Sequence, residues 1–121
     1  MRELLFRGKS QDGWHYFGLW GTPNLPVIIP ETIGQFTGLL DKKGIRIYEG
    51  DIVREELIPP RMNNIYEIKF NGGSFHLSNP SDKYVPLFAY DAEIISYLEV
   101  IGNIYESKHL LDNIDTKVFK N

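Results

Sequence analysis

The sequence predicts a mainly β fold: a sandwich or partly open barrel of many short antiparallel strands, with one or two short helices. Three observations carry this prediction. Short segments rich in β-branched and aromatic residues recur along the 121 residues. Clusters of Gly, Pro, Asn and Asp separate them about every 8–12 positions. Two tryptophans, seven tyrosines and seven phenylalanines also suit the core of a small β domain.

The first third of the chain begins with a predicted hairpin. Leu4–Arg7 is a short apolar run, and Asp12-Gly13 is a preferred hairpin turn. Trp14–Trp20 has apolar residues on both alternating faces, so we expect a strand that is covered on both sides. Pro30 ends the next apolar run, and a β-branched and aromatic strand follows over Thr32–Thr37.

Turn chemistry organises the middle of the chain. Asp41-Lys42-Lys43-Gly44 has Asp and Gly at the first and last positions of a tight turn. Glu49-Gly50-Asp51 indicates a bulge or a sharp corner. Ile65–Phe70 alternates as a strand does, and Asn71-Gly72-Gly73 turns it back into a hairpin.

The C-terminal part is less regular. Asp91–Leu98 fits a helical turn or an irregular strand, and Tyr97–Tyr105 reads as a strand. Ser107–Leu111 is the expected short helix, with Ser107 as its N-cap. We expect one domain over residues 1–121, of which about 112–121 form a frayed polar tail.

Composition excludes several classes of protein. The absence of cysteine rules out disulfides, a thiol nucleophile and thiolate metal sites, and it fits a reducing compartment. Thirteen basic and sixteen acidic residues give a net charge of −3, which opposes bulk attraction to DNA or to anionic membranes. No apolar run approaches the ~20 residues of a membrane span, and Met1–Arg7 lacks the apolar core of a signal peptide. We therefore expect a cytoplasmic protein.

Four sequence blocks, in order from end to end, resemble one family. They are Arg2–Lys9, Thr32–Leu39, the stretch from Asp41 through Val53, and Glu99–Glu106. The central string, with Gln-Phe-Thr-Gly, Asp-Lys-Lys-Gly and Tyr-Glu-Gly-Asp-Ile-Val, is highly specific. On these residues the chain is similar to the YopX-like proteins of phages and prophages. It departs from them at Lys108-His109, where the family tends to have Pro-Glu before Leu-Leu.

The resemblance implies a phage- or prophage-encoded protein of the host cytosol with a β-rich, sandwich-like fold. It implies no established activity, so there are no catalytic residues to carry over.

Lys42, Lys43, Arg46 and Tyr48 form the basic and aromatic group that we single out as a possible binding surface. Lysine and arginine can contact phosphates and an aromatic ring can stack on bases, so this group supports nucleic-acid binding as an alternative function. Charged turn residues are usually just solvated, and a protein of net charge −3 needs such local focusing to bind nucleic acid at all.

Glu49, Asp51 and Glu55 support a second alternative, a Mg²⁺-dependent hydrolase, because carboxylates that share a face can bind the ion or act as acid and base. Turn chemistry explains the same residues, with Asp51 accepting backbone N–H bonds at a corner and the glutamates solvated. We favour the turn, and we expect no catalytic residue, metal ligand or cofactor.

The histidines and the aromatic stripe have structural explanations. His15, His76 and His109 lack metal-ligand spacing, and we expect His76 to be a surface or half-buried residue, although it could pair with a neighbouring serine. Trp14, Tyr16 and Trp20, on one face of a strand, are expected to belong to the core. No phosphate-binding glycine loop is present.

The sequence therefore favours a binding or assembly module that is not an enzyme and that acts through protein–protein contacts. We expect those contacts to use a sheet face or the loops Lys42–Arg46 and Pro59–Asn64. Exposed edge strands make a homo-oligomer a further expectation, since pairing protects them.

Overall fold

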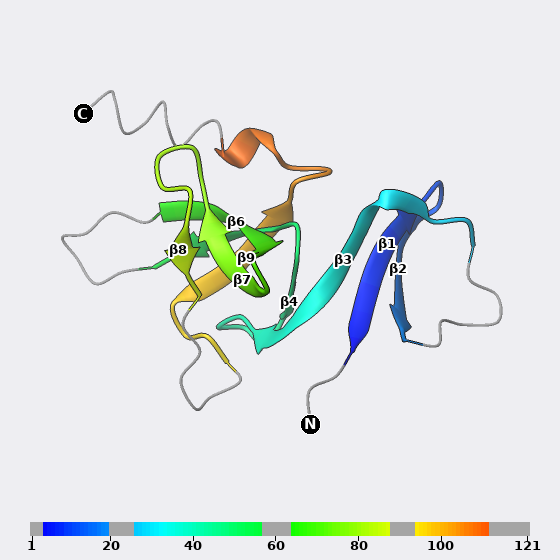
Figure 1. Ribbon diagram of the computed structural model, residues 1–121, viewed down its shortest axis with the longest axis horizontal. Helices are drawn as coiled ribbons and strands as arrows, with labels where there is room; N and C mark the ends of the chain where they lie inside the picture. The colour runs from blue at the N-terminus through cyan, green and yellow to red at the C-terminus, as the bar shows by residue number, and fades with distance from the viewer. Residues whose placement is uncertain (1–3, 20–25, 57–63, 88–93, 112–121) are drawn as a thin grey trace.

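Two antiparallel sheets make up the computed structural model, which describes residues 4–19, 26–56, 64–87 and 94–111 (Figure 1). Within these residues a single very short helix lies at 109–111, and the mainly β prediction is confirmed. Neither sheet closes on itself. The strands are β1 (Leu5–Ser10), β2 (Gly13–Gly18), β3 (Ile29–Leu40), β4 (Arg46–Tyr48), β5 (Asp51–Glu55), β6 (Asn64–Asn71), β7 (Ser74–Ser78), β8 (Val85–Pro86) and β9 (Leu98–Asn103).

The four-stranded sheet has the order β2-β1-β3-β4. Its β1–β2 hairpin pairs Ser10 with Gly13, so β1 continues beyond the predicted end at Arg7. The N-terminal part of β3 pairs with β1 and its C-terminal part with β4. Pro30 lies inside β3 instead of ending a strand. A proline is tolerated near the start of a strand. Here the Thr32 hydroxyl donates a hydrogen bond to the Ile29 carbonyl, just before Pro30.

The expected cover on both faces of β2 is wrong: none of its residues is fully buried, because the core cluster lies in the five-stranded sheet and takes only Ile47 from the sheet that contains β2. Tyr16 is 58% exposed, and Leu19, just beyond the strand, is 62% exposed. Trp14 is half-buried, and Trp20 lies outside the described residues. Trp14 and Tyr16, the two residues of the aromatic stripe that the structure describes, are therefore not core residues.

The five-stranded sheet has the order β8-β7-β6-β5-β9 and carries most of the core. The predicted β6–β7 hairpin is confirmed, with Asn71 paired to Ser74 across the two glycines. One core residue, Ile47, comes from β4, so the short strand β4 brings the other sheet into the core. The buried core cluster comprises Ile47, Val53, Tyr66, Ile68, Leu77, Ile95 and Leu98.

β4 and β5 follow each other in the chain but belong to different sheets, and a sharp corner joins them. Gly50 has φ +91°, a left-handed conformation that side chains rarely adopt. The Tyr48 N–H donates to Asp51 Oδ2 across the corner at 2.7 Å. The corner predicted at Glu49-Gly50-Asp51 is therefore confirmed.

The C-terminal predictions have mixed outcomes. The predicted strand Tyr97–Tyr105 corresponds to β9, and the Leu110 N–H donates to the Ser107 carbonyl at 2.9 Å in the short helix. The Asp91–Leu98 segment is described from residue 94 onward, where Ile94 makes an isolated bridge to Leu40 and no helix forms. Of the predicted loop Pro59–Asn64, residues 59–63 lie outside the described residues and Asn64 is the first residue of β6. The predicted tail at 112–121 also lies outside them. No helix in the described ranges is long and apolar enough to cross a membrane.

Candidate functional site

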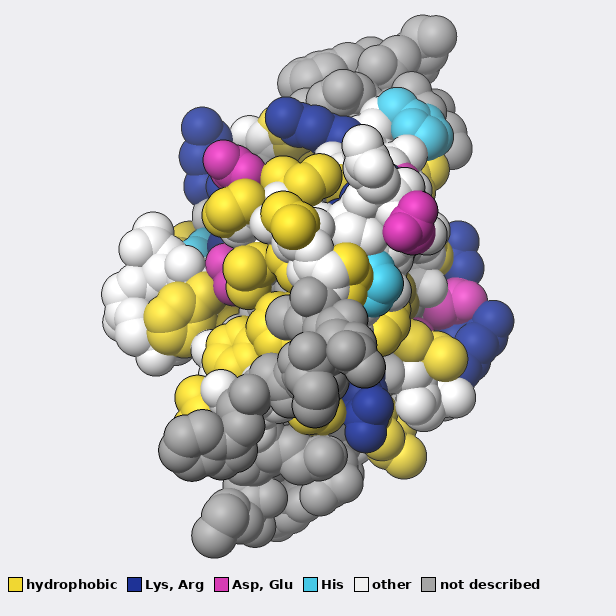
Figure 2. All heavy atoms as spheres, turned by 90° about the vertical axis from the view of Figure 1, so that its right-hand side faces the viewer, with side chains coloured by type: hydrophobic (Ala, Val, Ile, Leu, Met, Phe, Trp, Pro, Cys, Tyr) yellow, Lys and Arg dark blue, Asp and Glu magenta, His cyan; other side chains and the backbone are white. Residues whose placement is uncertain are grey.

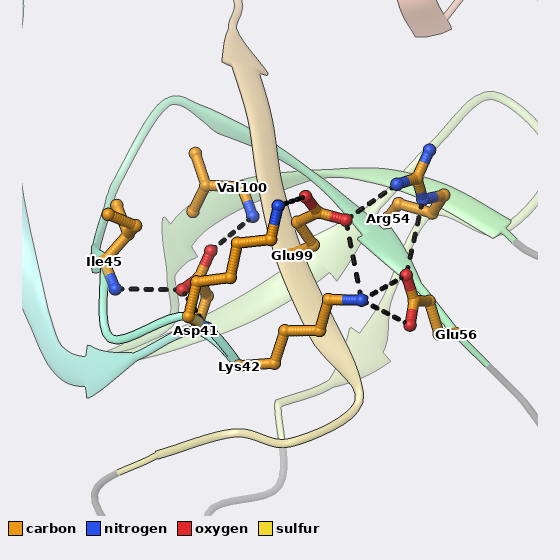
Figure 3. A network of polar contacts seen from close by, with 8 residues as sticks. Asp41, Lys42, Ile45, Arg54, Glu56, Glu99 and Val100 are labelled. Atoms are coloured by element: carbon orange, nitrogen blue, oxygen red, sulfur yellow. Dashed lines mark hydrogen bonds and ion pairs between the residues drawn. The ribbon is translucent and has the colours of Figure 1, made fainter.

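The turn that carries the candidate lysines is held by a fully buried aspartate. Asp41 Oδ1 accepts the Lys43 and Ile45 N–H groups at 2.8 and 2.9 Å, and its Oδ2 accepts the Val100 N–H at 2.9 Å (Figure 3). The predicted turn is confirmed. Because Val100 lies on β9, the same carboxylate fixes this turn to the five-stranded sheet.

Both candidate lysines already face carboxylates, as Figure 3 shows for Lys42. Lys42 Nζ lies 2.7 Å from each carboxylate oxygen of Glu56, and Lys43 Nζ lies 2.8 Å from Glu99 Oε2. Arg54 Nη2 donates to the other Glu99 oxygen at 2.7 Å. Hydrogen bonds from Lys43 and then from Arg54 lower the pKa of Glu99 to about 2. This surface therefore presents acidic side chains together with basic ones.

The other two members of the candidate group lie elsewhere. Tyr48 is only 3% exposed, and its ring packs 5.5 Å from the Phe36 ring and 5.7 Å from the Tyr16 ring, between centroids. The Arg46 guanidinium lies 5.7 Å from the centre of the Phe36 ring. A buried ring cannot stack on bases. Nucleic-acid binding by these residues stays a prediction that the geometry does not favour.

Sequence analysis missed Arg7, which occupies the contact between the sheets. Arg7 Nη2 lies 2.7 Å from Asp51 Oδ1, and both side chains are buried. The guanidinium lies 4.8 Å from the centre of the Trp14 ring and 5.0 Å from that of Tyr48. Burial raises the pKa of Asp51 to about 6, against the opposing effects of Arg7 and of the Tyr48 N–H. An arginine inside the apolar run Leu4–Arg7 was the signal that could have found this pair.

The three candidate carboxylates do not form a metal centre. The Asp51 carboxylate is occupied by Arg7 and by the Tyr48 N–H, which is the turn role that we favoured. Glu49 and Glu55 are half-buried. In the described ranges no three acidic or histidine side chains gather to hold an ion. The arrangement therefore gives the hydrolase alternative no support.

The histidines differ from expectation. His76 is 3% exposed, so placing it at the surface or half-buried was wrong. Its ring stacks on Tyr84 at 4.2 Å, and burial lowers its pKa. His15 Nε2 lies 2.8 Å from Ser10 Oγ, a pair that sequence analysis did not predict. The Asp12 N–H donates to the same hydroxyl at 3.1 Å, so this serine holds the β1–β2 turn.

An apolar patch lies on the opposite face of β1 from Arg7. Residues before and after Arg7 point away from it, and the Phe6 and Phe17 rings stack there at 6.0 Å. Ile28 and Ile33 lie against Gly8 on the same face, where a Cβ would collide with Ile28. Ile33 is 42% exposed and the others are half-buried. We call Phe6, Phe17, Ile28 and Ile33 the outer patch.

The side of the molecule that carries the four-stranded sheet is poor in charge. Figure 2 shows hydrophobic side chains gathered across the middle of this side. The strands β1, β2 and β3 contain only three charged residues. Of these, Arg7 is buried and Lys9 pairs with Glu106 at 3.3 Å, which leaves Glu31. Six of the eleven exposed large hydrophobic side chains in the described ranges lie between residues 4 and 33.

Comparison with known proteins places the chain in a family. The family model described as YopX protein matches residues 8–112. The chain belongs to the YopX family. This confirms the resemblance; the phage origin and cytosolic location that it implies stay predictions. Among solved structures, the YopX-family chain is similar to protein EF1440 from Enterococcus faecalis, with 25% identity and a TM-score of 0.47 over 90% of this chain and 75% of EF1440. No curated protein matches this chain.

Proposed function

We propose that this YopX-family protein is a binding module that holds a segment of a protein partner on the outer patch. The observation that supports this proposal is the apolar, charge-poor face of the four-stranded sheet. At its centre lie Phe6, Phe17, Ile28 and Ile33. The centre of a protein interface is enriched in aromatic residues and depleted of charge. An apolar patch of this kind on a soluble domain is typical of an interaction site.

The edge strand next to the patch suggests how the partner binds. β2 contains no charged residue and no proline, which are the usual devices that keep an edge strand from pairing. In the described ranges no strand pairs with its outer edge. An extended partner segment can add to such an edge through backbone hydrogen bonds, while apolar residues elsewhere in the partner cover the patch. The partner is therefore expected to offer an uncharged segment with high β propensity.

Selection from a random-peptide display library tests this proposal. The wild-type chain should enrich apolar peptides rich in β-branched and aromatic residues. Ile33→Lys places a charge on the patch at an exposed position, so its enrichment should fall at least about tenfold. The matched control is Ile94→Lys, which alters a similarly exposed isoleucine bridged to Leu40 at the C-terminal end of β3, away from the outer patch, and should select the same peptides as wild type.

Sedimentation of the same variants identifies a second copy of the chain as the partner. A wild-type dimer that Ile33→Lys converts to a monomer would assign the patch to self-association. A monomeric wild type that enriches no peptide beyond the Ile33→Lys background would overturn the proposed function.

A further inference from the structure

A pocket of about 340 Å³ lies against the β6–β7 hairpin, the loop that follows β7 and the short helix at 109–111. Three separate segments each contribute a lysine to its lining. They are Lys69 from β6, Lys83 from the loop and Lys108 from the turn just before the helix. The volume falls in the range of small-molecule sites in proteins. The fold therefore gathers three lysines that are distant in the sequence around one space.

The lining of this pocket has an excess of positive charge. Among the described residues that line it, Glu67 is the one acidic side chain, and Asp82, next to Lys83 in the chain, does not line it. Lys69 and Lys108 act on the half-buried Glu67 through their charge, although burial outweighs them and raises its pKa. In the described ranges none of the three lysines forms an ion pair, and all three side chains are exposed. Three positive charges and one negative charge leave an excess of two.

A neutral hydrogen-bonding group lies beside these charges. Ser78 is paired directly with Glu67 across the β6–β7 ladder, so its side chain lies on the same face of the sheet as those of Glu67 and Lys69. Ser78 is only 6% exposed, and its hydroxyl makes no hydrogen bond within the described part of the chain. Its oxygen is not sealed from solvent, in contrast to the hydroxyl of Tyr48. An acceptor that enters the pocket would supply the missing partner.

The loop that carries Lys83 is held in place by Asn79. The Asn79 side-chain amide donates to the Ile65 carbonyl at 3.0 Å, and its side-chain oxygen accepts the Ser81 and Asp82 N–H groups at 2.9 and 2.7 Å. These bonds fix the loop to β6 and define its turn. A ligand therefore meets a loop that is already ordered, which lowers the entropic cost of binding.

We propose that this pocket binds a phosphate monoester. Such a group carries nearly two negative charges at neutral pH and has three acceptor oxygens, which match the excess charge and the lysine and serine donors. The same group occurs in small phosphorylated metabolites and on phosphorylated serine side chains of proteins. The pocket belongs to the five-stranded sheet and the outer patch to the four-stranded sheet, so this site and the proposed function stand or fall separately.

NMR titration of the ¹⁵N-labelled full chain with phenyl phosphate and phenyl sulfate tests the proposal, because the two esters have similar shapes but differ in charge. Phenyl phosphate should shift the amides of Lys69, Ser78 and Lys83 and should bind at least about fivefold more tightly than the sulfate. Adenosine 5′-monophosphate and the peptide N-acetyl-glycyl-phosphoseryl-glycinamide then distinguish the two sources. Whichever binds more tightly identifies a small metabolite or a modified protein as the ligand.

Substitutions of opposite effect connect this binding to the pocket. Lys83→Gln removes one exposed charge, and affinity for phenyl phosphate should fall about 3–10-fold. Its matched control, Lys43→Gln, causes the same change in net charge at a lysine that pairs with Glu99 on β9, and should leave affinity unchanged. Glu67→Gln removes the carboxylate that repels the ligand, so affinity should rise about threefold, a result that damage to the fold would not produce.

Ser78→Ala tests the hydroxyl separately, and affinity should fall about threefold. Three results would each overturn the proposal. They are equal affinity for the phosphate and the sulfate ester, no shift at the amides of Lys69, Ser78 and Lys83, and equal losses in Lys83→Gln and Lys43→Gln.

Discussion

Arg7 Nη2 and Asp51 Oδ1 lie 2.7 Å apart, and this contact joins β1 of one sheet to β5 of the other. The two residues are 44 positions apart in the sequence, so the pair fixes a long-range relationship. A buried ion pair contributes little net stability compared with apolar residues of the same size, but breaking it leaves a charge without its partner. Its main effect is therefore to specify how the sheets meet.

Removing the arginine should destabilise the protein strongly. Arg7→Met keeps an apolar side chain of similar length but leaves Asp51 buried without its cation, and we expect a loss of about 3–5 kcal/mol in the free energy of unfolding at neutral pH. Urea denaturation followed by circular dichroism measures this loss. Lys9→Met is the matched control, because its ion pair with Glu106 is partly exposed and should contribute less than about 1 kcal/mol. Similar losses in the two variants would contradict the role assigned to Arg7.

The raised pKa of Asp51 predicts a pH dependence of stability. The pKa of its carboxyl is about 6 in the folded protein, compared with 3.8 for an unburied aspartate such as that of the unfolded chain. Between these pH values the native state therefore binds more protons than the unfolded state. Stability from this group therefore increases as the pH falls through 6. Relative to Asp51→Asn, the wild-type free energy of unfolding should rise by about 1 kcal/mol between pH 7 and pH 5.

Urea denaturation of both proteins at several pH values between 5 and 7 checks this, and the comparison with Asp51→Asn cancels the contributions of other groups. Glu99 acts in the opposite direction and at lower pH. Its pKa is lowered to about 2, so it contributes stability above pH 4.5 that is lost on further acidification. A difference between wild type and Asp51→Asn that does not change with pH would show that Asp51 stays charged.

Local turn chemistry made part of the fold predictable from the sequence. The turn at Asp41, the corner at Gly50 and the hairpin at Asn71 each depend on residues within a few positions of one another. The Asp51 hydrogen bond at the corner was predicted for the same reason, since its partner is three residues away. The conformational preference of a residue acts over a few neighbouring positions, so such turns can be predicted directly from the sequence.

The candidate site depends on which strands and loops become neighbours in space. These long-range contacts were harder to predict from the sequence than the local turns. Tyr48 lies two positions after Arg46 in a short strand. Its ring is nevertheless buried, because Phe36, Tyr16 and Arg7 from other strands of the same sheet pack against it. Lys42 and Lys43 looked like free cations because their partners, Glu56 and Glu99, are distant in the sequence. β2 resembled a core strand because its composition is apolar, whereas its position at an edge comes from the strand order.

Asp41 should be essential for stability because one carboxylate satisfies three backbone N–H groups. Asp41→Ala leaves these donors unpaired, and we expect a loss of about 2–4 kcal/mol. Hydrogen exchange should show faster exchange at the amides of Lys43, Ile45 and Val100 than at amides in β6 and β7. Asp12→Ala, at an exposed turn position, is the control and should change stability by less than about 0.5 kcal/mol. Unchanged exchange at Val100 would contradict the link between the turn and β9.

Gly34 is predicted to be a position where the backbone of β3 tolerates no side chain. A Cβ at this position would lie 2.5 Å from the Glu49 carbonyl oxygen, which is backbone and cannot rotate away. The contact is tight because the Glu49 N–H donates to the Gln35 carbonyl at 2.9 Å next to it. Gly34→Ala must therefore shift the corner between β4 and β5, and we expect it to cost about 1–3 kcal/mol.

Gly18→Ala provides the comparison for this prediction. The nearest atom to a Cβ at Gly18 is the Leu4 carbonyl oxygen at 3.8 Å, an ordinary contact, and its φ lies outside the left-handed region. Removing the flexibility of this glycine from the unfolded chain should leave stability unchanged or raise it by up to about 1 kcal/mol. The unfolding temperatures of the two variants should therefore shift in opposite directions from that of the wild type, or differ from each other by several degrees. Equal stability of the two variants would show that the corner yields without cost.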